Sequence, residues 1–367
     1  MRGAFATGAL GLALVLLGAG VDAEPLLAPG VALVALAAVT AGWVAAAARG
    51  ASVARELSSH RVAEEEPLTV RLTARAGALP FPGGALEDPL LPEPAPVHSG
   101  RAVARVRIEV RFARRGARAL AAPRLALRDP LGVARREVGE EGEDRVLVLP
   151  RVHPVIAAGE GSPLQTGGRA APVAGAEMEL DGLRPYRDGA PATRIHWPAL
   201  ARGAGLLERR LRPEGEGRPL VVLDAAGPVA TEDLDAAVRA AASLAHALAR
   251  AGGCSILLPG DRRATALEPD GRGWPVVHAR LAIVEAGPPP HAGGSALAAA
   301  AASAHAVYYV VARRGGRSPQ ALVRARGRVR LVVVAPGEGA AHRPAAFAVA
   351  GCHGYVLAPR VRRAVGA

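Results

Sequence analysis

Two uncharged apolar runs open the chain and dominate its hydropathy pattern. The first covers Ala4–Val21 and the second covers Pro29–Ala48. Each is close to the ~20 residues that a helix needs to cross a bilayer core of about 30 Å. The pattern therefore predicts a transmembrane helical hairpin within residues 1–50.

The charges that flank the two runs predict the direction of this hairpin. The connector carries Asp22 and Glu24, whereas Arg2 precedes the first run and Arg49 follows the second. Basic flanks stay on the cytoplasmic side. We therefore expect a multi-pass protein of the cell membrane whose later residues are cytoplasmic. A signal peptide cleaved after Ala23 is the alternative, which the second apolar run disfavours.

Residues 51–160 change to short alternating runs broken by Pro and Gly, and they predict an antiparallel β-sandwich. Polar and apolar positions alternate with the period of half-buried strands. The clearest runs are Leu68–Leu72, Ala104–Phe112, Arg124–Leu127 and Arg145–Leu149.

Residues 216–367 alternate between short apolar runs and helical patterns, which is typical of a doubly wound parallel sheet. The predicted strands are Leu220–Leu223, Cys254–Leu258, Ala264–Leu267, Val307–Val311, Val329–Val334 and Val356–Leu357. The predicted helices are Glu232–Ala251, capped by Thr231, then Trp274–Glu285, Gly294–Ala304 and Pro319–Arg326. The fold class is thus α+β multidomain, with the hairpin, the sandwich and an α/β domain in that order.

Residues 161–215 connect these domains and contain two of the scarce aromatic side chains, which make up 3% of the chain. Arg184, Arg187 and Arg194 lie close in sequence to Tyr186 and Trp197. Guanidinium groups pair with carboxylates and stack on rings. The segment therefore predicts an ordered polar junction that holds the two soluble domains together.

The same segment resembles the signature of the bacterial domain of unknown function 58 family, a pattern of the form R-x-Y-x-x-G-D-x-x-R-x-I-x-W-x-x-x-A-R. The matching residues, within one position of spacing, are Arg184, Tyr186, Gly189, Arg194, Ile195, Trp197, Ala201 and Arg202. Ala190 replaces the family's Asp, although Asp188 precedes the glycine. The family's arginine-glycine turn and its D-P-x-G segment resemble Arg115-Gly116 and Asp129-Pro130-Leu131-Gly132.

This resemblance implies a membrane hairpin, a β-sandwich and a C-terminal von Willebrand factor A-like domain. It also implies partners: a MoxR-type ATPase and other membrane proteins of the same gene cluster, among them a transglutaminase-like protein. We therefore expect a membrane-anchored cytoplasmic interaction protein rather than an enzyme. A structural envelope protein that faces outward is a further alternative.

Catalytic motifs are missing from the sequence: there is no G-x-S-x-G, no Walker glycine loop, no H-E-x-x-H and no dinucleotide fingerprint. His196 and Asp188 could form an acid–base pair, which leaves a hydrolytic enzyme as the alternative function. We expect these groups instead to satisfy the arginines of the junction.

The metal site that the resemblance implies is degenerate in this sequence. It takes the form D-x-S-x-S after the first strand, and hard cations need several oxygen ligands. Asp224 matches the acid, but Ala226 and Pro228 stand at the hydroxyl positions. We expect no metal or other cofactor, and we expect Arg313 to pair with Asp224 in its place.

The net charge of +12 would by itself suggest nucleic acid as a partner. All basic residues are Arg, however, and they are interleaved with acids along the chain. No aromatic-rich basic face is present to stack bases, so nucleic-acid binding is not expected. Cys254 and Cys352 lack metal-ligand spacing and predict buried, reduced thiols.

Overall fold

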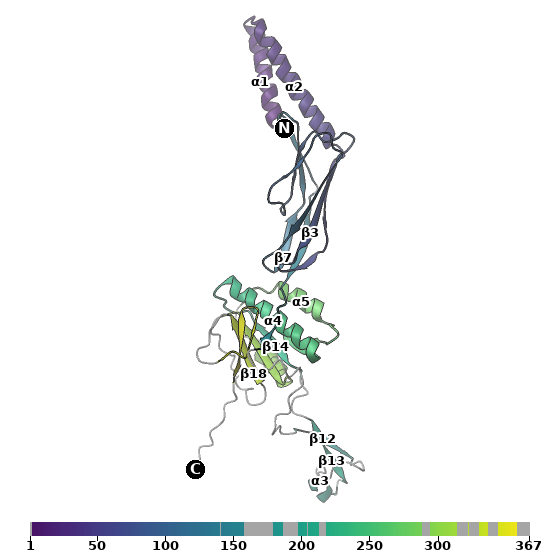
Figure 1. The fold of residues 1–367 in the computed structure, drawn as a ribbon, viewed down its shortest axis with the longest axis vertical. Helices are drawn as coiled ribbons and strands as arrows, with labels where there is room; N and C mark the ends of the chain where they lie inside the picture. The colour runs from purple at the N-terminus through teal and green to yellow at the C-terminus, as the bar shows by residue number, and fades with distance from the viewer. Residues whose placement is uncertain are drawn as a thin grey trace. The chain divides into compact units, whose positions relative to one another are not determined.

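The computed structural model describes residues 2–139, 141–157, 179–185, 197–203, 205–212, 218–287, 294–313, 322, 330–336 and 344–357. The chain divides into two compact units (Figure 1), which we name the N-terminal unit, Met1–Val148, and the C-terminal unit, Leu149–Ala367. The hairpin therefore belongs to the same unit as the strands that follow it. The boundary between the two units lies between Val148 and Leu149.

Two antiparallel helices open the N-terminal unit, α1 (Arg2–Gly20) and α2 (Glu24–Ala48). Both are long and apolar enough to span a bilayer. They approach closely because neither Gly11 nor Gly30 has a side chain: a Cβ on Gly11 would lie 2.7 Å from the carbonyl oxygen of Gly30. The second helix begins five residues before the predicted apolar run, since Pro25 in its first turn costs no hydrogen bond.

The rest of the N-terminal unit consists of antiparallel strands in three sheets of order β1-β3-β6, β2-β10-β7 and β5-β4-β8-β9. The four predicted strands are present as β3, β6, β8 and β10, and six further strands were not predicted. The bounds are β1 Ser52–Leu57, β2 Arg61–Ala63, β3 Leu68–Arg75, β4 Gly84–Glu87, β5 Ala95–Val97, β6 Val103–Val110, β7 Gly116–Ala121, β8 Arg124–Arg128, β9 Arg135–Val138 and β10 Glu143–Leu149.

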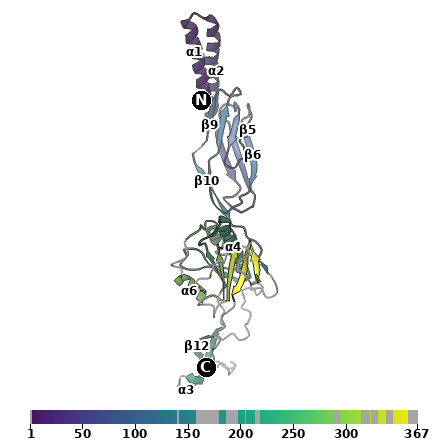
Figure 2. The same cartoon turned by 90° about the vertical axis from the view of Figure 1, so that its left-hand side faces the viewer.

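One hydrophobic core joins these strands to the base of the hairpin. Along β3, buried and more exposed residues alternate, as a strand with one face on a core requires. Val44 and Ala47 of α2 are fully buried in the same cluster, and Ala4 of α1 contributes to it. Figure 2 shows β9 beside the base of the hairpin. The hairpin and the strands therefore form one packed body.

The C-terminal unit is built on an eight-stranded sheet of order β11-β19-β20-β18-β17-β14-β15-β16. Its strands are β11 Ile156–Ala157, β14 Leu220–Asp224, β15 Cys254–Leu257, β16 Thr265–Leu267, β17 Ala306–Val311, β18 Arg330–Pro336, β19 Phe347–Val349 and β20 Cys352–Leu357. The four central strands, β15, β14, β17 and β18, are parallel. The predicted adjacency of the first and fourth strands of this region is confirmed by the pairing of β14 with β17.

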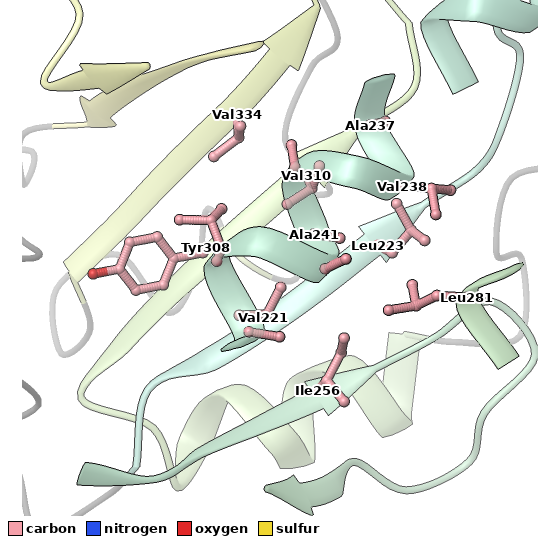
Figure 3. Packing of buried hydrophobic residues seen from close by; sticks show 14 of the residues in the cluster. Val221, Leu223, Ala237, Val238, Ala241, Ile256, Leu281, Tyr308, Val310 and Val334 are labelled. Atoms are coloured by element: carbon pink, nitrogen blue, oxygen red, sulfur yellow. The ribbon is translucent and has the colours of Figure 1, made fainter. Parts of the chain in front are cut away.

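Both faces of this sheet carry helices. Helix α4 (Thr231–Gly252) and helix α5 (Trp274–Ala282) cover one face, where α4 packs alanines against Val221, Leu223 and Ile256 (Figure 3). Helix α6 (Gly294–Ala302) packs on the alternate residues of the same strands. The helical prediction for Pro319–Arg326 falls outside the described residues apart from Leu322.

Two details of the C-terminal unit differ from the prediction. Thr231 is the first residue of α4 rather than its cap; Ala230 precedes the helix, and the Asp233 carboxylate accepts the Ala230 N–H at 3.3 Å. The last strand, β20, is antiparallel to β18 and is followed across the sheet by β19 and β11. The antiparallel direction of these edge strands was not predicted, because the two apolar residues Val356 and Leu357 do not indicate a strand's direction.

Residues 149–157 belong to the C-terminal unit because they bind along its helices and sheet edge. The Nε2–H of His278 donates to the carbonyl oxygen of Pro150 at 2.8 Å, and the His153 N–H donates to Ser243 Oγ at 2.9 Å. Strand β11 then pairs with β19 at the edge of the sheet. These contacts explain why the unit begins at Leu149.

Candidate functional site

The segment predicted to carry the protein's function forms a separate two-stranded ribbon. Strand β12 (Glu179–Pro185) pairs with β13 (Leu207–Arg212), and the short helix α3 (Trp197–Ala201) lies between them in sequence. Arg184 stands opposite Glu208 in the register. The predicted residues Tyr186, Arg187, Asp188, Gly189, Arg194 and His196 lie outside the described residues.

The described part of this segment exposes apolar side chains. Trp197 is 57% exposed, Leu200 39% and Leu206 41%. Arg202 is also exposed. Because the Trp197 ring is exposed, its truncation would leave no cavity in a core. The predicted role of the segment as a junction between the two soluble domains rests mostly on residues outside the described ones and stays a prediction.

The second predicted site lies where β14 ends. The Asp224 side chain is 5% exposed, and both of its oxygens accept hydrogen bonds. Oδ1 accepts from the backbone N–H of Ala226 at 3.0 Å, and Oδ2 accepts from the Tyr309 hydroxyl at 2.5 Å. Tyr309 stands on β17, which pairs directly with β14. Each oxygen of the carboxylate therefore has a neutral donor.

The predicted ion pair between Asp224 and Arg313 is not formed. Within the described residues, Asp224 has no salt bridge, and the Nε of Arg313 is buried without a hydrogen-bond partner. The phenol of Tyr309 takes the place that was assigned to the guanidinium. It can do so because a neutral donor satisfies a buried carboxylate without the desolvation cost of a second charge.

The environment of Tyr309 keeps its hydroxyl protonated. Burial raises the pKa of Tyr309 above its usual value, and the hydrogen bond to the Asp224 carboxylate raises it further. The nearby guanidinium of Arg313 opposes this shift. The Asp224–Tyr309 pair is therefore a fixed donor–acceptor pair at neutral pH and has no proton to exchange there.

No group of three or more His, Cys, Asp or Glu side chains capable of holding an ion occurs in the described ranges. Asp224 contributes a single carboxylate, and its two oxygens are already engaged by Tyr309 and Ala226.

A buried charge network in the N-terminal unit was missed by the sequence analysis. The Arg55 side chain is 1% exposed, and its guanidinium contacts Asp88 at 3.0 Å and Asp144 at 2.7 Å. It also donates to the carbonyl oxygens of Leu120 and Ala121, both at 2.9 Å. The network joins β1, β7, β10 and the residue that follows β4.

The sequence did contain a signal for Arg55. Residues Val53, Arg55 and Leu57 alternate with more exposed neighbours along β1, so the period of two places the arginine on the inward face of the strand. A charged residue at an inward position needs buried partners. That reasoning would have pointed to acids on neighbouring strands.

Three rings meet between α4 and α5: Trp274 and His278 are stacked, and His246 is tilted against Trp274. The Trp274 ring lies 4.6 Å from the His278 ring and 4.9 Å from the His246 ring, centroid to centroid. Burial lowers the pKa of both histidines, and the Arg250 charge lowers that of His246 further. Since His278 also holds the carbonyl of Pro150, the stack supports the segment that begins the C-terminal unit.

Both cysteines have the buried, unpaired state that the sequence predicted. Cys254 and Cys352 are free and 0% exposed. Burial raises the pKa of each thiol to about 12. Neither thiol is therefore a nucleophile at neutral pH, because nucleophilic attack requires the thiolate.

Comparisons with known proteins add no relative: no protein-family model, no curated protein and no solved structure matches the chain. The resemblance to the domain of unknown function 58 family therefore rests on the signature residues themselves.

Proposed function

We propose that the chain is a membrane-anchored protein-interaction scaffold of the domain of unknown function 58 type. In this proposal α1 and α2 span the bilayer, and the strands of the N-terminal unit form a β-sandwich at its surface. The C-terminal unit is a von Willebrand factor A-like domain without a metal, which carries the ribbon β12–β13. The soluble parts face the cytoplasm.

The observation that carries the proposal is the distribution of exposed apolar side chains. A soluble protein buries most large apolar side chains of a helix against its core, yet the hairpin exposes them on the surface that faces away from the helix–helix contact. The exposed residues of the hairpin are Phe5, Leu10, Leu12, Leu16, Leu17, Val21, Val31, Val34, Val39 and Trp43. A hydrocarbon environment accounts for this surface.

The second part of the distribution concerns the ribbon. Trp197, Leu200 and Leu206 place three exposed apolar side chains within ten residues. Aromatic side chains that are exposed in a free protein and covered in a complex are common at the centres of interfaces. We propose that this surface binds the partner, and the resemblance favours a MoxR-type ATPase.

Anchoring is tested by alkaline carbonate extraction of membranes that contain the full chain. The proposal expects the chain to stay in the membrane pellet, and release into the supernatant would contradict it. Orientation is tested with single cysteines at exposed positions of the sheets, such as Glu109→Cys. A membrane-impermeant maleimide should fail to label this site in intact cells and should label it after lysis.

Partner recognition is tested by comparing Trp197→Ala with Val276→Ala. Both residues are apolar and exposed, by 57% and 64% respectively, but Val276 lies on α5, outside the ribbon. A purified MoxR-type ATPase from the same organism should bind the unaltered chain and the Val276 variant, and it should lose affinity for the Trp197 variant. Failure to bind the unaltered chain would contradict the proposed partner.

A further inference from the structure

The turn between β8 and β9 is tightly built around a buried carboxylate. Asp129 is 3% exposed, and its carboxylate accepts the backbone N–H groups of Leu131, at 2.9 Å, and Ala134. The N–H of Gly132 donates to the carbonyl oxygen of Asp129 at 2.9 Å. Pro130 has a fixed φ. These bonds hold the turn in one conformation.

This rigid turn holds an apolar side chain away from the protein. Leu131 is 68% exposed, whereas Ala134, three residues later, is fully buried. Gly132 has φ +73°, and a Cβ at this position would collide with the guanidinium of Arg128. The turn therefore fixes a leucine on the surface beside a cation.

The turn lies against the start of the hairpin. A Cβ on Gly3 would lie 2.5 Å from the carbonyl oxygen of Val133 and 3.8 Å from that of Gly132. Leu131 is the next residue along the turn. Phe5, two residues further into α1, is 81% exposed. The exposed leucine is thus close to the first lipid-facing residues of the proposed transmembrane helix.

Other residues indicate that the base of the hairpin, beside this turn, lies at the membrane interface. Trp43, in the last turns of α2, is 39% exposed, and tryptophan is enriched at the level of lipid headgroups. The end of α2 contacts a second loop, since a Cβ on Gly77 would collide with the backbone of Arg49. In that loop Leu79 is 39% exposed. Two leucine-bearing loops therefore flank the base of the hairpin.

We propose that the Asp129–Ala134 turn is a membrane-contacting element, with Leu131 inserted at the boundary between lipid headgroups and acyl chains. The inference rests on the proposed anchoring of the hairpin. Insertion removes an exposed leucine from water, which is favourable. Arg128 forms no ion pair within the described residues, and its guanidinium beside Gly132 is placed to bind a lipid phosphate.

The consequence is a second point of attachment between the N-terminal unit and the bilayer. The hairpin alone would allow the packed body of hairpin and strands to tilt as a whole in the bilayer. A turn that is packed on α1 and also inserted beside it would fix the tilt of the strands relative to the membrane. The D-P-x-G segment that contributes to the family resemblance thus gains a physical role.

The test uses the full chain in lipid nanodiscs with an environment-sensitive fluorophore on single introduced cysteines. The native Cys254 and Cys352 are buried with thiol pKa values raised to about 12, so they do not compete for the label. The probe positions are Leu131→Cys in the turn, Leu16→Cys on the lipid-facing side of α1, and Glu109→Cys near the opposite end of the strands. Glu109 lies six positions along β6 from Val103, the residue paired with Arg75, which is about 20 Å at the usual rise per residue.

Lipids with a nitroxide near the top of the acyl chain supply the readout. We expect quenching and a blue-shifted emission at positions 16 and 131, and neither at position 109. Quenching at position 16 without quenching at 131 would overturn this inference and leave the anchoring intact. No quenching at position 16 would contradict the anchoring itself. A melting temperature of Leu131→Cys equal to that of the unaltered chain is expected, since the leucine side chain is exposed; a large drop would mean that Leu131 packs within the protein.

Discussion

The two units bury charge in different ways. In the N-terminal unit, Arg55 is surrounded by two carboxylates and two backbone carbonyls. In the C-terminal unit, Asp224 is satisfied by a tyrosine hydroxyl and a backbone N–H, while the nearby Arg313 Nε has no partner in the described residues. The first site ties four chain segments together through charge, whereas the second keeps a single charge with neutral donors.

This difference predicts which substitutions most destabilise each unit. Removal of Arg55 leaves Asp88, whose side chain is fully buried, without its counter-charge. Removal of Tyr309 leaves Asp224 with one hydrogen bond fewer, whereas removal of Arg313 breaks no hydrogen bond of its Nε to a described residue. The loss of stability should therefore be largest when Arg55 is removed, intermediate for Tyr309 and smallest for Arg313.

The largest effect is expected for Arg55→Ala. Removing one partner of a buried ion pair costs roughly 3–5 kcal/mol because the other charge is stranded. Hydrogen exchange of the N-terminal unit, resolved by peptide, should show this loss in β1, β7 and β10. Arg107→Ala is the control, since Arg107 is an exposed arginine on β6. Equal exchange in the two variants would mean that the network contributes nothing to stability.

The two cysteines sharpen this experiment because both belong to the C-terminal unit. Their thiols react only when that unit opens. In Arg55→Ala we expect Cys254 and Cys352 to stay protected against a thiol reagent while the N-terminal unit exchanges faster. Loss of protection in this variant would mean that the two units unfold together.

An intermediate effect is expected for Tyr309→Phe. The change leaves Oδ2 of the buried Asp224 without its donor, which costs about 1–3 kcal/mol. Thiol labelling of Cys254 under increasing denaturant measures the loss directly in the C-terminal unit. Tyr355→Phe is the control, because the Tyr355 hydroxyl makes no hydrogen bond to a described residue. A smaller loss for Tyr309→Phe than for the control would contradict the role assigned to the pair.

The same tyrosine predicts a dependence on alkaline pH. Its pKa is raised in the folded chain, so its contribution to stability is complete below the unfolded value near 10. Above that pH the unfolded tyrosine ionises first, and the unaltered chain loses about 1.4 kcal/mol of stability per pH unit relative to Tyr309→Phe. Denaturant unfolding at pH 8 and pH 11 measures this. A constant difference between the two chains would mean that the folded pKa is not raised.

The smallest effect is expected for Arg313→Gln. Since no hydrogen bond of the Arg313 Nε is lost, the free energy of unfolding should change by less than about 0.5 kcal/mol. The sequence had predicted a destabilisation through loss of a pair with Asp224. A decrease as large as that of Tyr309→Phe would restore that prediction.

The sequence predicted the regular parts of the fold well because their periodicity is strong. The uncharged runs became α1 and α2, the alternation at Leu68–Leu72 became β3, and the pattern after Thr231 became α4. The short strands β4, β5 and β9 were missed because three or four residues between Pro and Gly carry too little periodicity. Their pairing is decided by the shared core.

The sites were harder to predict because they depend on distant partners. The place of Asp224 at the end of β14, beside β17, followed from strand order, but its partner did not. Tyr309 alternates with Tyr308 between the two faces of a fully buried strand, so one hydroxyl had to find an acceptor there. Arg313 follows the end of the same strand. Only the packing of the sheet decides whether Tyr309 or Arg313 reaches the Asp224 carboxylate.

The central claim is that the ribbon around Trp197 binds a partner and does not hold the domains together. It is tested most directly by the affinity of nanodisc-embedded chain for a purified MoxR-type ATPase, measured with and without Trp197→Ala. We predict at least about a tenfold loss of affinity, which corresponds to about 1.4 kcal/mol, and an unchanged melting temperature. Unchanged affinity together with a lowered melting temperature would contradict the claim.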